Sequence, residues 1–148
     1  MDFKTVYRRK IIIIPYTNNG KYLFVKDKHS KEWGFISGGV KRYESVEHAA
    51  ERELQEETSD LFKKVPFTNC KHVKYSSNYR PHKLFKIDHQ RAEIVISKYD
   101  IFIYKIEDSA FLPFKPNSEI IDIRICRYNE LFRVWDLTKM IHKHLRLR

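Results

Sequence analysis

The segment Ser45–Thr58 constrains this sequence most, because it predicts a helix that turns carboxylates toward the protein interior. It contains no glycine or proline and is rich in Ala, Leu, Glu, Gln and Arg, which favour helices. Ser45 is a suitable N-cap, and Glu47 suits the positive end of the helix dipole. We therefore expect a helix that begins just after Ser45 and ends near Thr58.

A helical projection at about 100° per residue places acidic side chains on the inward face of this helix. The inward stripe is apolar and consists of Val46, Ala49, Ala50 and Leu54. Glu53 and Glu57 lie within about 20° of Val46, inside this stripe. Glu56 lies about 80° from Val46, at the edge of the stripe. The opposite face, where we expect solvent, carries His48, Arg52 and Gln55.

Three glutamates at this spacing repel one another, and those on an inward face also lose hydration. A surface helix would pair such acids with lysine, but here only Arg52 is adjacent. A divalent cation relieves the repulsion most simply, because Mg²⁺ and Mn²⁺ take oxygen ligands and leave room for phosphate oxygens. The residues therefore predict a metal site. The alternative is a plain acidic helix whose glutamates extend into water.

Two glycines, Gly38 and Gly39, lie between a predicted strand and the loop that leads to this helix. Glycine permits backbone conformations closed to other residues and lets a ligand or metal come close to main-chain oxygen. The alternative is an ordinary tight turn. Glu44, just before the helix, is expected to accept hydrogen bonds from loop amides or to pair with Arg52.

The rest of the chain predicts strands around this helix and a second helix near the end. Asn18-Asn19-Gly20 tolerates positive φ and predicts a hairpin. The second helix, Leu137–Leu145, is basic and amphipathic. Together these elements predict an α/β (α+β) fold with a mixed sheet between helices. The predicted strands are Val6–Tyr16, Tyr22–Val25, Glu32–Ile36, Cys70–Tyr75, Ala92–Ile106 with a break near Lys98, and Ile120–Tyr128.

The chain of 148 residues carries 29 Lys and Arg against 19 Asp and Glu, a formal net charge of +10. This excess favours polyanionic partners, so we expect nucleotides or RNA to contact the basic surface. The basic residues are spread out, without an arginine-rich tract or zinc-finger spacing, and their alternative role is as solvated faces. The length suits one domain with its own core.

Residues Tyr75–Lys86 mix aromatic and basic side chains, which can stack a base and hold phosphates. Tyr79, Arg80 and Lys83 are the substrate-binding candidates there, and the alternative is a loop with a charged rim. Trp33, beside the glycines, is a further candidate for stacking a base. A place in the core is the alternative for Trp33.

Several features indicate a protein that stays inside the cell and off the membrane. No apolar stretch approaches the roughly 18 residues of a membrane span. The amino-terminal residues MDFKTVYRRK have no apolar core of the signal-peptide type behind them. Cys70 and Cys126 are too few for a disulfide framework or a zinc site, and we interpret both as reduced thiols. We therefore expect a cytoplasmic location.

The segment from Gly38 to Asp60 resembles the Nudix box, Gly-x5-Glu-x7-Arg-Glu-aliphatic-x-Glu-Glu-x-Gly-aliphatic. Ser37 stands where proline is common in the family. Ser59 replaces the terminal glycine and Asp60 the last aliphatic residue, and both lie beyond the acidic cluster, at the exit of the helix. The positions that match at the required spacing are Gly38, Glu44, Arg52, Glu53, Leu54, Glu56 and Glu57.

The resemblance implies a single Nudix hydrolase domain over residues 1–148, built as an α/β/α sandwich. It also implies a metal-dependent pyrophosphohydrolase with Mg²⁺ or Mn²⁺ as cofactor. Such an enzyme cleaves a phosphoanhydride bond in a nucleoside diphosphate linked to another moiety. Because dimers are frequent in this family, a homodimer is a further expectation.

The resemblance also implies roles for residues of the box. Glu53 and Glu57 would be the principal metal ligands, helped by the main-chain oxygen of Gly38. Glu56 would be a third ligand or the group that orients and deprotonates the attacking water. Arg52 would hold the glutamates by ion pairing.

In this family the general base that accepts a proton from the attacking water can also come from outside the Nudix box. Glu119, just before a predicted strand, is one such candidate, and Glu93 is the other. Three functions stay open: a small-nucleotide pyrophosphatase, an mRNA-decapping enzyme, which the charge favours, and a non-catalytic module that binds nucleotides or RNA. The Ser37-Gly38-Gly39 lead-in resembles the small-substrate branches, and the inward acids argue against a module without activity.

Overall fold

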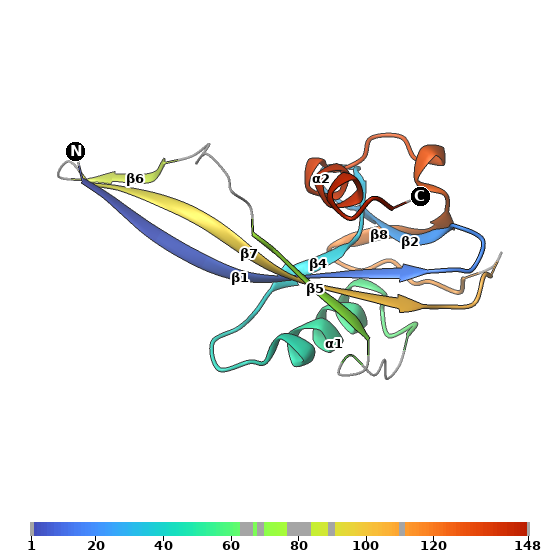
Figure 1. The fold of residues 1–148 in the computed structure, drawn as a ribbon. Helices are drawn as coiled ribbons and strands as arrows, with labels where there is room; N and C mark the ends of the chain where they lie inside the picture. Colours follow the sequence, from blue (N-terminus) through green and yellow to red (C-terminus); the bar gives the residue numbers. More distant parts are fainter. Residues whose placement is uncertain are drawn as a thin grey trace.

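The computed structural model describes residues 2–62, 67, 70–76, 84–88, 91–109 and 112–147, with the main chain alone at 2–4, 84–88 and 91–94. Its two longest strands, β1 (Asp2–Tyr16) and β7 (Arg91–Lys105), pair in parallel along their whole length. In Figure 1 they run side by side through the body of the molecule and extend beyond it toward the amino terminus. These two strands are the centre of the sheet.

The other strands add to this centre in antiparallel pairs. The hydrogen-bonded order is β3-β2-β1-β7-β5, while β4 pairs with β1, β6 with β7 and β8 with β2. The sheet is therefore mixed, as the sequence predicts. The strand bounds are Tyr22–Asp27 for β2, Trp33–Gly34 for β3, Ile36–Gly39 for β4, Lys71–Ser76 for β5, Leu84–Asp88 for β6 and Ile120–Cys126 for β8.

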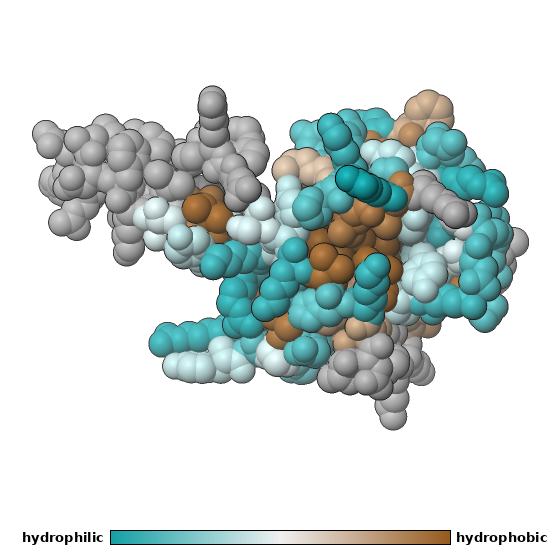
Figure 2. Space-filling view, in the orientation of Figure 1, coloured by the Kyte–Doolittle hydropathy of each residue, from teal (hydrophilic) through white to brown (hydrophobic). Residues whose placement is uncertain are grey.

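Helices cover both faces of the sheet. The helix α1 (Val46–Glu57) lies on one face and α2 (Asp136–His144) on the other, with a 3-10 turn, η2 (Tyr128–Glu130), before α2 (Figure 1). Figure 2 shows apolar side chains at the level of the sheet with hydrophilic side chains around them. The α/β/α arrangement agrees with the expected fold class.

The run of isoleucines in β1 explains why this strand is central. Ile11 and Ile13 belong to the core cluster under α1, and Ile12 and Ile14 belong to the cluster under α2. Successive side chains of a strand point to opposite faces, so an unbroken apolar run fits a strand that is buried on both sides. All four side chains are at most 1% exposed.

Several element boundaries differ from the sequence predictions. The break expected near Lys98 is absent because β7 pairs with β1 without interruption on both sides of this residue, although its pairing with β5 ends there. The strand predicted over Glu32–Ile36 is divided, because β3 pairs with β2 and β4 pairs with β1. The strand predicted over Ile120–Tyr128 ends at Cys126, before η2. The strand β6 was not predicted at all.

Other local predictions are confirmed. The helix begins after Ser45, whose hydroxyl accepts a hydrogen bond from the amide of His48 at 3.1 Å. Gly20 has a φ of +79° in the turn between β1 and β2. Cys70 is partly buried and Cys126 is buried. In the part of the chain that the structure describes, no helix is long and apolar enough to cross a membrane.

Candidate metal centre

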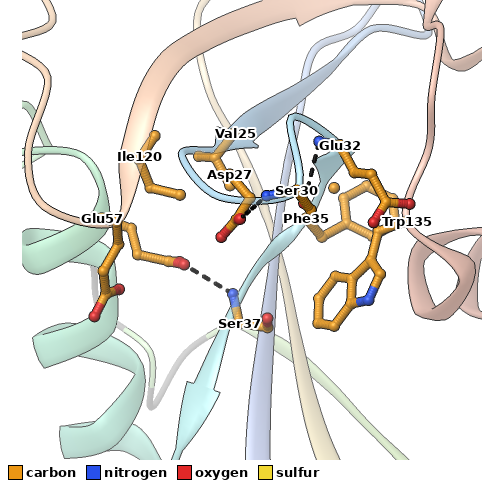
Figure 3. A pocket seen from close by; sticks show the side chains of 11 residues that line it. Val25, Asp27, Ser30, Glu32, Phe35, Ser37, Glu57, Ile120 and Trp135 are labelled. Carbon is orange, nitrogen blue, oxygen red and sulfur yellow. Dashed lines mark hydrogen bonds between the residues drawn. The ribbon is translucent and has the colours of Figure 1, made fainter.

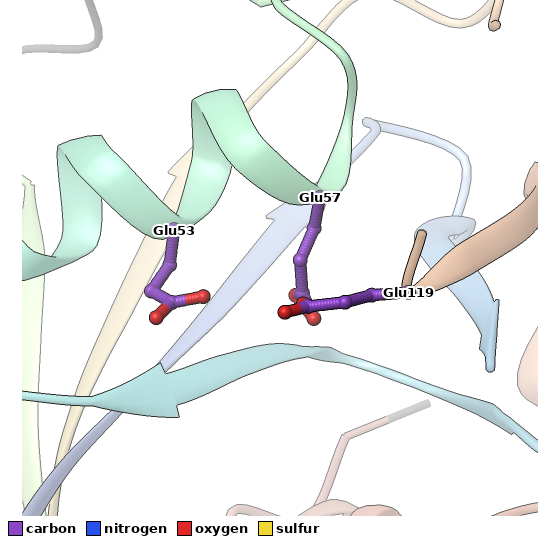
Figure 4. A group of neighbouring side chains, drawn as sticks. All are labelled: Glu53, Glu57 and Glu119. Atoms are coloured by element: carbon purple, nitrogen blue, oxygen red, sulfur yellow. The ribbon is translucent and has the colours of Figure 1, made fainter. Parts of the chain in front are cut away.

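Three glutamates from two distant parts of the chain meet at one point. Glu53 and Glu57 come from α1, and Glu119 comes from the residue just before β8 (Figure 4). One carboxylate oxygen from each lies within 4.8 Å of the others. Glu53 and Glu57 are only 8% and 7% exposed, whereas Glu119 is exposed. The inward projection of Glu53 and Glu57 is therefore seen in the structure.

The strand β4 closes against these carboxylates. A Cβ atom on Gly38 would lie 2.0 Å from the carboxyl carbon of Glu53, so only glycine fits there. Among the described glycines only Gly20 has a positive φ, so Gly38 is required for space and not for an unusual backbone conformation. Next to it, the amide of Ser37 donates a hydrogen bond to Oε2 of Glu57 at 3.2 Å.

Arg52 joins the loop before α1 to the acids of the helix. Its Nε and Nη2 donate to the two carboxylate oxygens of Glu44, both at 2.9 Å, and Nη2 also donates to the carbonyl of Gly39 at 2.8 Å. The same Glu44 carboxylate accepts from the amide of Lys41 at 2.9 Å. Glu44 thus makes both of the contacts that the sequence leaves as alternatives.

The expectation that Arg52 faces solvent is wrong. Its side chain is 18% exposed, because the loop before α1 folds back over this face of the helix. From there Nη1 donates to Oε1 of Glu53 at 2.8 Å and lies 3.5 Å from Oε2 of Glu56. Arg52 therefore compensates Glu53 through one hydrogen bond, whereas its bidentate pair, the stronger kind of charged contact, is with Glu44.

Glu44, Glu53 and Glu57 differ in how well the protein compensates their negative charge. Hydrogen bonds from Arg52 hold the pKa of Glu44 down at about 2. Burial raises the pKa of Glu53, although the contact with Arg52 opposes this. Burial, and then the charge of Glu53, raises the pKa of Glu57 well above its ordinary value, and the Ser37 amide only partly opposes them. Glu57 is thus the uncompensated acid of the cluster.

The donor set suits a divalent cation. All three groups offer carboxylate oxygen, the ligand that hard cations such as Mg²⁺ and Mn²⁺ prefer. The Glu53 carboxylate occupies the space beside Gly38 where a side chain would lie. Glu53 is therefore held on the side of the cluster that faces β4. A cation there would also supply the positive charge that Glu57 lacks.

A residue that the sequence analysis did not identify, Asn117, connects the end of α1 to Glu119. Its Nδ2 donates to the carbonyls of Glu56 and Glu57 at 3.1 and 3.2 Å, and to the hydroxyl of Ser59 at 3.0 Å. Its Oδ1 accepts from the amides of Glu119 and Ile120, both at 2.9 Å. One side chain thereby sets the position of Glu119 relative to the helix. The only signal in the sequence is an asparagine two residues before Glu119, which is typical of an Asx turn.

The structure describes the remaining predicted site residues only in part. Glu56 is half exposed, at 50% of its side chain, and is not among the three converging acids. The main chain of Glu93 pairs with Lys4 on the long β1–β7 ribbon, and its side chain lies outside the described residues. The substrate-binding candidates Tyr79, Arg80 and Lys83 also lie outside the described residues.

A cavity of about 400 Å³ opens beside the three acids (Figure 3). Glu57 and Glu119 belong to both the cluster and the cavity lining. Trp33, the aromatic candidate named from the sequence, packs against the core cluster under α2 and is not part of this lining. Trp135, which precedes α2, lines the cavity instead.

The NUDIX domain family model matches residues 6–146, nearly the whole chain. The chain therefore belongs to the Nudix family. A search among curated proteins finds no match to this chain.

Solved structures share the fold at low sequence identity. The bifunctional NMN adenylyltransferase/ADP ribose pyrophosphatase of Francisella tularensis has a TM-score of 0.65 and 18% identity over 95% of this chain and 41% of that one. This chain thus spans about two fifths of that protein, which has also been solved with AMP and a manganese ion. The E. coli dihydroneopterin triphosphate pyrophosphohydrolase has a TM-score of 0.59 and 16% identity over 93% and 96% of the two chains. A C. elegans Ap4A hydrolase has a TM-score of 0.55 and 17% identity over 90% and 89%.

We expect Glu57→Gln to stabilise the metal-free protein at neutral pH, by on the order of 1 kcal/mol, because it removes a buried uncompensated charge. Below the ordinary pKa of 4.5 both folded and unfolded chains keep this carboxyl protonated, so the variant gains little there. The raised folded pKa makes wild-type stability fall as pH rises above 4.5, and the advantage of the variant grows. Thermal unfolding in EDTA at pH 5 and pH 8 measures this, and an equal or smaller advantage at pH 8 would contradict it.

Asn117→Ala is expected to weaken Mn²⁺ binding by about tenfold, because Glu119 loses its link to the end of α1. Titration calorimetry with MnCl₂ measures the dissociation constant. Asn129→Ala, at an exposed position in η2, is the matched control and should bind Mn²⁺ like wild type. Equal affinities for the two variants would show that Asn117 does not position the acidic cluster for metal binding.

Proposed function

We propose that this protein hydrolyses a phosphoanhydride bond in a nucleoside diphosphate linked to another moiety, with Mg²⁺ or Mn²⁺ as cofactor. The observation that carries the proposal is the pair of buried acids, Glu53 and Glu57, joined by Glu119, with Glu57 and Glu119 in the lining of a cavity. A protein without a use for these charges would gain stability by replacing them. A purely structural role for the cluster is therefore disfavoured.

Each residue has a proposed task. Glu53, Glu57 and the main-chain oxygen of Gly38 would hold the cation, and Arg52 would position Glu53 through its 2.8 Å contact. A divalent cation bound there would neutralise phosphate charge and make a water molecule more acidic. Arg52 acts through a ligand, so it is a positioning residue.

The proton of the attacking water needs an acceptor. Glu119 is exposed, lines the cavity and belongs to the cluster, so we assign it as this acceptor. Glu56 is the alternative, half exposed and 3.5 Å from Arg52. In the reaction the water oxygen forms a bond to phosphorus, the anhydride P–O bond breaks, and the water proton passes to this carboxylate.

We further propose that the protein acts in the cytoplasm and that a homodimer is its assembly state. Nucleotides are the proposed substrates, and capped RNA is the second candidate because the net charge of +10 favours a ligand with many phosphates.

A substrate panel tests the proposed reaction. Wild type is expected to hydrolyse at least one nucleotide of the panel, which contains ADP-ribose, dinucleoside polyphosphates, nucleoside triphosphates and capped RNA, only with Mg²⁺ or Mn²⁺. Glu57→Gln should lower kcat by about 100-fold or more, since a buried ligand is lost. Glu51→Gln, at a partly exposed position of the same helix outside the acidic cluster, should change kcat less than about twofold. Wild-type rates for Glu57→Gln, or no hydrolysis of the panel by wild type, would refute the proposal.

Salt dependence separates the two substrate classes. If the basic surface binds several phosphates of capped RNA, kcat/KM for this substrate should fall by about 10-fold or more between 50 and 200 mM salt. Hydrolysis of a small nucleotide should change far less over this range. A capped RNA that is cleaved without any such salt dependence would argue against a role of the basic surface in RNA binding.

A further inference from the structure

We propose that the cavity beside the metal centre binds a guanine base, with Glu32 accepting hydrogen bonds from its Watson–Crick edge and Trp135 stacking on it. The inference rests on the proposed function, because it names the base of the nucleotide whose phosphates would lie at the three glutamates. It assigns Glu32 and Trp135 a role in substrate specificity.

The cavity has two chemically different sides. Figure 3 shows Glu57 and Ser37 on one side, and Glu32, Phe35 and Trp135 on the other. A nucleotide with its phosphates at Glu57 would therefore extend its base toward the aromatic side. The volume of about 400 Å³ is within the range of small-molecule sites.

The aromatic side offers a fixed surface for stacking. Trp135 remains 39% exposed, while its main-chain amide donates to the carbonyl of Trp33 at 2.9 Å. A Cβ on Gly34 would lie 3.2 Å from Cε3 of this indole, so the ring packs closely against the backbone there. Phe35 is 3% exposed and stacks on Phe24 with a centroid distance of 5.2 Å. A planar base can stack on the exposed part of the Trp135 indole.

The charged lining of the cavity is acidic throughout. Asp27, Glu32, Glu57 and Glu119 line it, and the described lining contains no lysine or arginine, although the chain has a net charge of +10. Carboxylates accept hydrogen bonds and donate none when ionised. The cavity therefore favours a group of the ligand that donates hydrogen bonds. The phosphates would be bound by the cation instead.

Among the described carboxylates that line the cavity, Glu32 is the one that lies outside the metal cluster and accepts no hydrogen bond from a described residue. Asp27 uses Oδ2 to accept from the amides of His29 and Ser30 at 2.9 and 2.8 Å, and Glu57 belongs to the metal cluster. The main chain of Glu32 is held by the Asp27 amide, which donates to its carbonyl at 2.9 Å. Its carboxylate lies on the aromatic side of the cavity (Figure 3), and no ion pair joins it to a side chain that the structure describes.

Guanine matches one carboxylate better than the other common bases do. Its N1–H and 2-amino group are adjacent donors that can meet the two oxygens of Glu32 together. Adenine and cytosine present an amino group next to an acceptor nitrogen, and uracil presents one N–H between two carbonyls. Each of these would leave a carboxylate oxygen facing an acceptor, which costs binding energy.

Equilibrium binding of mononucleotides tests this directly, because GMP, IMP and AMP contain no anhydride to hydrolyse. In titration calorimetry with MnCl₂ present, wild type should bind GMP about tenfold or more tightly than AMP. IMP keeps N1–H but lacks the 2-amino group, so its affinity should lie between them. Equal or tighter binding of AMP, or no GMP binding at millimolar concentration, would overturn the inference.

Variants separate recognition of the base edge from stacking. Glu32→Gln should lower the GMP-to-AMP affinity ratio to about two or less, because one acceptor oxygen becomes a donor. Trp135→Ala should weaken GMP and AMP by the same factor, and Trp135→Phe should restore part of both. Glu107→Gln, at an exposed position away from the cavity lining, should match wild type. An unchanged ratio in Glu32→Gln would contradict the role of Glu32.

The binding results are independent of the proposed reaction. A GMP preference without hydrolysis of any anhydride would contradict the proposed function and support the cavity assignment. Metal-dependent hydrolysis with no base preference would support the proposed function and contradict the cavity assignment.

Discussion

The burial of two neighbouring carboxylates, Glu53 and Glu57, is the constraint on which the rest of this structure depends. Both lie on the face of α1 that packs against the sheet, where charge is costly without a partner. Gly38 has no side chain, which leaves room for the carboxylate of Glu53, and the amide of Ser37 donates one hydrogen bond to Glu57. These features allow the acids to be buried, but they do not neutralise both of them.

The compensation is asymmetric, and this asymmetry gives the site its chemistry. Arg52 forms an ion pair with Glu44, which connects the preceding loop to α1, and it also donates a hydrogen bond to Glu53. Glu57 receives no cation from the described residues and faces Glu119 instead. A fold that compensates Glu53 and leaves Glu57 without a cation loses stability there, and this is the position that a cation would stabilise most.

Local sequence was enough to predict the acidic face, because a helix of known period converts spacing directly into direction. It was not enough to predict the burial of Arg52, since the helical projection does not include the loop that covers this side chain. Nor could it single out Asn117, whose contacts join residues some 60 positions apart through the pairing of β8 with β2.

The end of α1 shows how a departure from the family pattern is accommodated. Ser59 stands in place of the glycine of the Nudix box, and both Ser59 and Asp60 adopt positive φ, at 51° and 60°. The left-handed turn that glycine would favour is thus kept, at a conformational cost of about 1 kcal/mol per residue. The bond from Asn117 to the Ser59 hydroxyl at 3.0 Å helps to hold this turn.

Anomalous diffraction from crystals soaked in MnCl₂ tests the central claim most directly, because it locates the ion without reference to activity. We expect a manganese peak within ligand distance of the Glu53 and Glu57 carboxylates, with Glu119 close by. A map with no peak there, and with both side chains turned toward bulk solvent, would contradict the account.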